Sequence, residues 1–287
     1  MKPILFSLGK ISSLGKISSA ELLTQEARLT TEVSEPALAE ATAPAPENQR
    51  KSNLSTLTTA TRIVDADSLW LERECILPAG AAGMHGGPYK MLRTQVLRRL
   101  DKLGVNSLAV VGTAAGTGKT LTAINLAIAI AADPERTALL IDLDLRKPSI
   151  HRRLGIEPAV GIDDCLRHGQ PLKEAMVRLG GYERLVILPG RERTTDSSEL
   201  LATRHTEAMI LEMRHRYKDR ILVFDLPPVL QADDALAFAR HAQAVLVVVA
   251  EGRTRRDDLV RTIELLREVP IIGTVLNATR ERVDTYY

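Results

Sequence analysis

The sequence predicts a doubly wound α/β fold, in which a mainly parallel sheet is flanked by helices. Apolar runs alternate along the chain with stretches of helical periodicity. These runs are continuous in Val, Ile and Leu, which is typical of strands buried on both faces. Two of the runs end in aspartates, at the edge where open parallel sheets bind their ligands.

Each predicted strand corresponds to one of these apolar runs, and each predicted helix to a stretch with helical periodicity. We expect strands at 108–111, 138–142, 185–188, 221–225, 244–249 and 271–276, and helices at 121–131, 199–217, 232–240 and 256–267. Another helix is expected to begin at Pro88, because proline suits the first turn. Its basic residues lie mostly off the apolar stripe, and they form either a solvated face or a contact for another subunit or an anionic lipid.

Segment 110–120 joins a predicted strand to a predicted helix through small residues that end in Gly-Lys-Thr. The glycines let the backbone N–H groups converge on one anion, and the helix adds the positive end of its dipole. Lys119 can reach the β- and γ-phosphates of a nucleotide, and the Thr120 hydroxyl can ligate Mg²⁺. The first motif position holds Thr113 instead of the usual glycine. The predicted nucleotide-binding residues are Thr113, Ala114, Ala115, Gly116, Thr117, Gly118, Lys119, Thr120 and Leu121.

Aspartates follow two of the predicted strands. Asp142 and Asp144 alternate at the end of one strand and therefore lie on the same side, and Asp225 ends another. A single aspartate at a strand end is as often a turn residue. Together with Lys119 and Thr120, however, these three acids predict a Mg-nucleotide site.

Composition excludes few functions. The chain has 287 residues, a net charge of +2 and two cysteines without metal-ligand spacing. Its apolar runs are far shorter than the ~20 residues that span a bilayer, and its start has too short an apolar core for a secretory signal. These features predict a cytoplasmic protein, and the absence of a concentrated basic patch predicts no nucleic-acid partner.

The chain divides into four parts. Residues 1–60 hold a tandem Ser-Leu-Gly-Lys-Ile-Ser repeat and a stretch rich in Ala, Thr, Pro and Glu, which predict a disordered N-terminal extension. Residues 61–87 form an anchoring segment and linker. Residues 88–282 form the predicted nucleotide-binding domain, and residues 283–287 form a tail that ends in two tyrosines.

Three motifs carry a resemblance to a known family. They are the small-residue phosphate loop, the Asp-x-Asp-x-Arg-Lys-Pro-Ser sequence within 139–150, and the Asp-x-Pro-Pro sequence that begins at Asp225. Together they resemble the bacterial tyrosine kinases of capsular and exopolysaccharide synthesis, from about residue 88 to the C-terminus. Spacing and segment 67–78 are most similar to the exosortase-associated branch. Partitioning and septum-placement ATPases of the wider class carry a lysine early in this loop, where this chain has Ala114.

The resemblance implies an ATP-dependent protein-tyrosine autokinase that uses Mg²⁺. It implies that Asp142 accepts the proton of the acceptor tyrosine, that Asp144 is a second acid near the metal, and that Asp225 holds Mg²⁺ with Thr120. Asn277 resembles an adenine-contacting asparagine of the wider class.

Two further residues keep alternative roles. Arg146 either orients the acids or the γ-phosphate, or ties down the loop after the strand. Asp234 lies where the family has an aspartate near the site, and it is equally suited to be a helix cap.

The resemblance also implies acceptors and partners. Tyr286 and Tyr287 resemble a short version of the family's tyrosine-rich tail. The alternative is that they belong to an ordinary frayed terminus without this role. The assembly motif Glu-x-x-Arg-x-x-Arg reads Gly87, Lys90 and Arg93 here, which puts a family-type homo-oligomer in doubt. The expected activating partner is a membrane-bound polysaccharide chain-length or co-polymerase protein, which would place the chain at the inner membrane. The alternative is an ATP-hydrolysing switch or scaffold without kinase activity.

Overall fold

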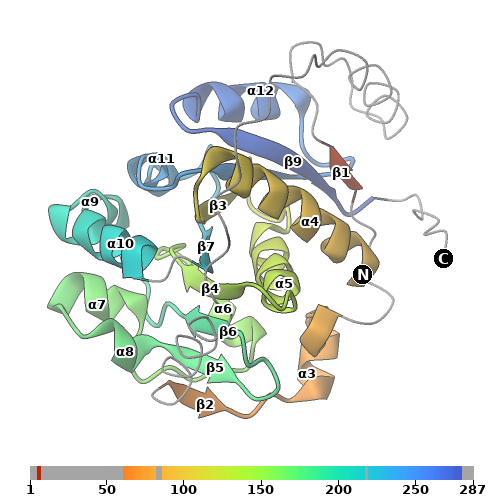
Figure 1. The fold of residues 1–287 in the computed structure, drawn as a ribbon. Helices are drawn as coiled ribbons and strands as arrows, with labels where there is room; N and C mark the ends of the chain where they lie inside the picture. The colour runs from red at the N-terminus through yellow and green to blue at the C-terminus, as the bar shows by residue number, and fades with distance from the viewer. Residues whose placement is uncertain (1–4, 8–60, 82–85, 217–218, 280–287) are drawn as a thin grey trace, which may run out of the picture.

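The computed structural model describes residues 5–7, 61–81, 86–216 and 219–279. Within these ranges the strands form one nine-stranded sheet in the order β1-β9-β8-β3-β7-β4-β6-β5-β2 (Figure 1). Neighbouring strands are parallel except for β1 with β9 and β5 with β6. The strands are β1 (Leu5–Ser7), β2 (Arg62–Val64), β3 (Ser107–Gly112), β4 (Thr137–Asp142), β5 (Val177–Leu179), β6 (Leu185–Leu188), β7 (Arg220–Asp225), β8 (Val245–Ala250) and β9 (Ile271–Asn277).

Helices cover both faces of this sheet. They are α3 (Ser68–Arg73), α4 (Gly86–Leu103), α5 (Lys119–Ala131), α6 (Ile150–Arg153), α7 (Ile162–His168), α8 (Leu172–Ala175), α9 (Ser197–Leu201), α10 (Arg204–Arg216), α11 (Asp234–Ala239) and α12 (Arg256–Leu265). Along β3, Leu108 and Val110 join a core with α4 and α5, whereas Ala109 and Val111 join a core with α10, α11 and α12. The doubly wound, mainly parallel sheet is therefore confirmed, and burial on both faces explains its unbroken apolar runs.

The predicted single helix at 199–217 is wrong, because the structure has two helices, α9 and α10, in its place. Thr203 lies between them, and its Oγ1 accepts a hydrogen bond from the Thr206 N–H at 3.2 Å. The Thr206 hydroxyl in turn donates to the Leu200 carbonyl at 2.7 Å. A threonine that binds an N–H three residues later is an N-cap, so a new helix begins here.

The anchoring segment packs into the main core. Leu71, Ile76 and Leu77 are buried there with α4 and α5. Asn125 of α5 holds the segment from inside, since its Oδ1 accepts from Leu77 N at 2.9 Å and its Nδ2 donates to Cys75 O at 3.0 Å. In Figure 1 this orange segment lies at the end of the sheet opposite the blue β9.

The predicted N-terminal extension, 1–60, is described at residues 5–7, which form β1 beside β9. Its other residues lie outside the described ranges. The other predicted helices correspond to α4, α5, α11 and α12, and each boundary that was predicted lies within two residues of the observed one. β2 and β5, which pair with each other, were not predicted.

We predict that Asn125→Ala lowers the free energy of unfolding by about 2 kcal/mol, because it leaves the buried Leu77 N–H and Cys75 carbonyl without their partner. Urea denaturation of the full chain measures this change. The control is Lys102→Ala, on the exposed side of α4. Equal stability of the two variants would show that Asn125 does not hold the segment.

Candidate nucleotide-binding site

The phosphate loop, residues 113–118, connects β3 to α5 at the carboxyl edge of the sheet. Gly116 and Gly118 have φ angles of 79° and 89°, in the left-handed region that favours glycine. Thr113 is not among the residues with positive φ, so the usual first glycine is not required here. α5 begins at Lys119, directly after the loop, and directs its first N–H groups toward the loop.

Two side chains from other elements hold this loop. Asn277, at the end of β9, donates from Nδ2 to the Thr117 carbonyl at 2.9 Å. A Cβ at Gly118 would lie 1.9 Å from that same nitrogen, so position 118 has no space for a side chain unless Asn277 moves. Gln231 accepts from the Ala115 N–H at 3.1 Å, although nothing in the sequence marked Gln231 as a site residue. Asn277 is thus beside the loop, and its adenine contact stays a prediction.

The sheet brings the three predicted acids together. β4 and β7 pair so that Asp142 lies opposite Asp225. Lys119 Nζ lies 2.8 Å from Asp144 Oδ2 and 3.4 Å from Asp225 Oδ1. It also lies 3.2 Å from the Thr120 hydroxyl. All of these side chains are buried, so their charges are largely shielded from water.

Burial governs the protonation of this cluster. Burial and the nearby charge of Asp225 raise the pKa of Asp142 to about 7, against the opposing effect of two backbone N–H donors. Burial also raises the pKa of Asp225, although Lys119 opposes the shift. For Lys119 burial lowers the pKa, but Asp225 and Asp144 outweigh it, so the net pKa is raised and the ammonium form is favoured.

Asp142 also organises the loop that follows β4. Its Oδ2 accepts from the N–H groups of Ser149 and Ile150, both at 2.9 Å. Its Oδ1 accepts from the Asp144 N–H at 3.3 Å. The carboxylate therefore connects the start of this loop to the start of α6.

Arg146 connects the same loop to α11. Its Nε donates to Asp234 Oδ1 at 2.9 Å and to Ser197 Oγ at 3.2 Å. Its Nη2 donates to Asp233 Oδ1 at 2.7 Å. This geometry matches the loop-tying role of the two predicted for Arg146. Asp234 is the first residue of α11 and an ion-pair partner, while Asp233, which sequence reasoning missed, is the residue at the N-cap.

The donor atoms suit a hard cation such as Mg²⁺. Asp225 Oδ2 is buried without a hydrogen-bond partner in the described part of the chain, and carboxylate and hydroxyl oxygens are the ligands that Mg²⁺ prefers. No group of three or more His, Cys, Asp or Glu residues that could hold a metal occurs within the described ranges. Phosphate oxygens and water would therefore have to complete the coordination of a metal at Thr120, Asp144 and Asp225.

The remaining predicted residues are less informative. Tyr286 and Tyr287 lie outside the described residues. Gly87 and Lys90 lie in the first turns of α4, and Arg93 donates to the Ala129 carbonyl at 3.3 Å. None of the helices in the described ranges has the length and hydrophobicity to cross a membrane.

Comparisons with known proteins assign the chain to a family. The model of the CobQ/CobB/MinD/ParA nucleotide binding domain matches residues 108–285, more than half of the chain. Tyrosine-protein kinase YwqD of Bacillus subtilis (strain 168) is 25% identical over 212 residues, which cover 73% of this chain and 88% of YwqD. The succinoglycan biosynthesis transport protein ExoP of Rhizobium meliloti (strain 1021) is 33% identical over 180 residues, which cover 60% of this chain and 22% of ExoP.

A solved structure agrees with these relatives. The crystal structure of the VpsO kinase domain has a TM-score of 0.60 and 27% identity, and the match covers 67% of this chain and 93% of that domain. Among the relatives, the chain spans most of YwqD but about a quarter of the tyrosine kinases of Acinetobacter johnsonii and Ralstonia solanacearum. The chain therefore belongs to the CobQ/CobB/MinD/ParA nucleotide-binding domain family, and the proteins that it resembles there include bacterial tyrosine-protein kinases.

Proposed function

We propose that this chain is an ATP-dependent protein-tyrosine autokinase of exopolysaccharide or capsule synthesis. The observation that carries the proposal is the meeting of Asp142, Asp144 and Asp225 with Lys119 at the phosphate loop. Phosphoryl transfer to a hydroxyl needs groups that hold the metal and a group that accepts the proton of the hydroxyl, and these acids can fill both roles. The kinase names of the relatives and the polysaccharide named for ExoP support the same function.

Lys119 has two sets of partners in this mechanism. In the structure its ammonium group is neutralised by Asp144 and Asp225. Lys119 would bind the β- and γ-phosphates of ATP, and Asp144, Asp225 and the Thr120 hydroxyl would hold the Mg²⁺. Bound Mg²⁺ would neutralise the charge that develops on the transferred phosphoryl group.

Asp142 is the proposed proton acceptor. A pKa of about 7 leaves a substantial fraction of the carboxylate ionised near neutrality, and it still makes the group basic enough to take a proton from tyrosine as the new bond forms. Its contact with the Asp144 N–H, in the cluster beside the phosphate loop, supports this role. Arg146 acts indirectly, by holding the loop of these acids against α11.

The acceptors and the partner are also proposals. Tyr286 and Tyr287 would receive the phosphoryl group from a neighbouring copy. A membrane-bound co-polymerase would bring the chain to the inner membrane and activate it. A homo-oligomer of the family type lacks its usual acid, since Gly87 stands at that position.

Asp142→Asn should lower kcat by about 100-fold, as expected for the loss of a general base, while Mg-ADP affinity changes little. Phosphotyrosine formation and equilibrium binding of Mg-ADP measure the two effects. Asp257→Asn, on the first turn of α12, is the control. Because Asp142 also holds the start of α6, thermal unfolding must show that the variant remains folded. An unchanged kcat would remove Asp142 from the mechanism.

The rate should also depend on pH. Since the pKa of Asp142 is raised to about 7, the carboxyl group becomes protonated as the pH falls below that value and can no longer accept a proton. We therefore expect kcat to fall as pH is lowered from 8 to 6, roughly tenfold per unit once the pH is well below the pKa. A flat profile measured over this range at saturating Mg-ATP would contradict the assignment.

Replacing both Tyr286 and Tyr287 with phenylalanine should abolish phosphotyrosine on the chain and leave ATP hydrolysis intact. Intact mass and peptide mapping after incubation with Mg-ATP measure the phosphate, and Tyr217→Phe is the control. Persistent phosphotyrosine in the double variant would exclude the tail as acceptor. ATP hydrolysis without phosphotyrosine in the parent chain, alone or with the cytoplasmic part of a candidate partner, would favour the switch function.

A further inference from the structure

A cavity lies at the amino ends of the strands, away from the phosphate loop. It is a cavity of about 990 Å³ between the end of α10, the end of α11 and the end of α12. Its lining includes Val269 and Pro270, which precede β9, and Gln243, which precedes β8, so it lies at the amino ends of strands whose carboxyl ends face the nucleotide site. A smaller cavity of about 410 Å³ shares Arg214 and Gln243 with it. We call these two cavities the basic pocket.

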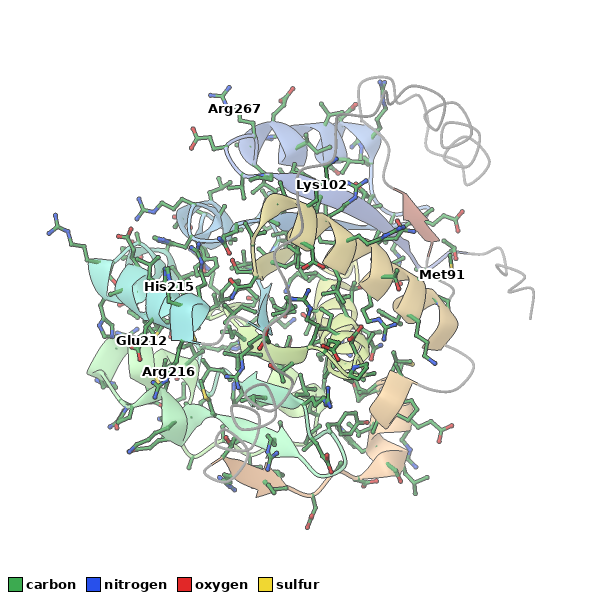
Figure 2. All side chains as sticks on the ribbon, viewed as in Figure 1. Met91, Lys102, Glu212, His215, Arg216 and Arg267 are labelled. Atoms are coloured by element: carbon green, nitrogen blue, oxygen red, sulfur yellow. The ribbon has the colours of Figure 1, made fainter. Side chains whose placement is uncertain are left out.

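The basic pocket has an excess of positive charge. The larger cavity is lined by four arginines and two glutamates, namely Arg214, Arg240, Arg261, Arg267, Glu264 and Glu268. Within the described part of the chain, neither Arg214 nor Arg261 takes part in an ion pair. Figure 2 shows Arg267 projecting outward at the molecular surface, so we leave it out of the ligand set.

Arg214, in the wall between the two cavities, has an unsatisfied donor. Its Nε is buried without a hydrogen-bond partner in the described residues, and burial lowers the pKa of its guanidinium. Buried donors without partners are rare in folded proteins, because each one costs the free energy of its lost hydration. Arg214 and Arg261 both line the larger cavity, and an anion held there would offset their positive charge.

The other walls suit an aromatic ring. Leu236, Leu265 and Pro270 contribute apolar surface to the larger cavity. Gln243 Oε1 already accepts from the Asn106 N–H at 3.2 Å and the Ser107 hydroxyl at 2.9 Å, which leaves its Nε2 as a donor for a ligand. Arginines beside apolar surface are the combination that binds a phosphate carried on an aromatic ring.

We infer that the basic pocket, through Arg214, Arg261 and Gln243, binds the phosphorylated tyrosines of the C-terminal tail of a second copy of this chain. The source of the phosphate rests on the proposed function. The tail reads Val-Asp-Thr-Tyr-Tyr, and each phosphate adds about −1.5 to −2 charges to its acidic end, which complements the pocket.

Chain length favours a second copy over the chain's own tail. The tail follows β9, whose last residue, Asn277, lies at the edge of the phosphate loop. To reach the basic pocket it would have to return along the seven residues of β9, about 20 Å at 3.3 Å per residue. From 278 to 286 the chain spans at most about 28 Å when fully extended, which leaves little for the turn and for entry into the pocket. A tail from another copy has no such limit.

The test is binding of a fluorescent peptide of residues 280–287, phosphorylated at Tyr286 and Tyr287, to the full chain saturated with Mg-ADP. We expect Arg261→Gln and Arg214→Gln each to weaken binding by about tenfold, as for loss of a charge-assisted hydrogen-bonding group. The control is Arg256→Gln, an exposed arginine on α12 that does not line the pocket. Arg261 is exposed, so its variant remains informative if Arg214→Gln is unstable.

The unphosphorylated peptide should bind at least about tenfold more weakly. Equal peptide affinity of the Arg261→Gln and Arg256→Gln variants would overturn the proposal. Displacement of the peptide by phenyl phosphate or inorganic phosphate at concentrations similar to that of the peptide would also overturn it, because it would show a general anion site. Because the peptide is synthetic, its binding does not depend on kinase activity. A chain that binds it but makes no phosphotyrosine would refute the proposed function and leave the pocket assignment intact.

Discussion

The charge balance around Lys119 is the interaction on which the candidate site depends. A buried ammonium group is costly unless carboxylates neutralise it, and here Asp144 and Asp225 do so at 2.8 and 3.4 Å. In the proposed function the phosphates of the nucleotide would take over this neutralisation of Lys119 and free the two acids for the metal. The burial of this cluster strengthens each of its charge interactions.

The order of the strands makes that cluster possible. β3, which leads into the phosphate loop, lies between β8 and β7, and β7 pairs with β4. The in-register pair of Asp142 and Asp225 therefore lies directly beside the loop. Contacts from outside this centre keep the parts in place: Asn277 and Gln231 hold the loop, and Arg146 fixes the acid-bearing segment to α11.

The two ends of the sheet have opposite electrostatic character. At the carboxyl end, Asp142, Asp144 and Asp225 are buried near Lys119, which forms ion pairs with the last two. At the amino end, arginines exceed glutamates around a cavity with apolar walls. In the two proposals, the tail is phosphorylated at the nucleotide site and then binds the basic pocket of another copy. The product of the reaction would thus link two copies of the chain. The proposed assembly then depends on phosphate, not on the helix motif whose acid is replaced by Gly87.

The sequence by itself determined the sheet type, the phosphate loop and the identity of the acids, because each depends on a local pattern. These patterns are continuous apolar runs, glycines where the backbone needs a positive φ, and aspartates at strand ends. It missed the break at Thr203, because apolar residues continue on both sides of this threonine. Only the tertiary structure decided that Asp142 meets Asp225, that Gln231 reaches Ala115 and that Arg146 pairs with Asp234. Those contacts join residues about 80 to more than 110 positions apart, and such distances are set by strand order and register, which no local pattern encodes.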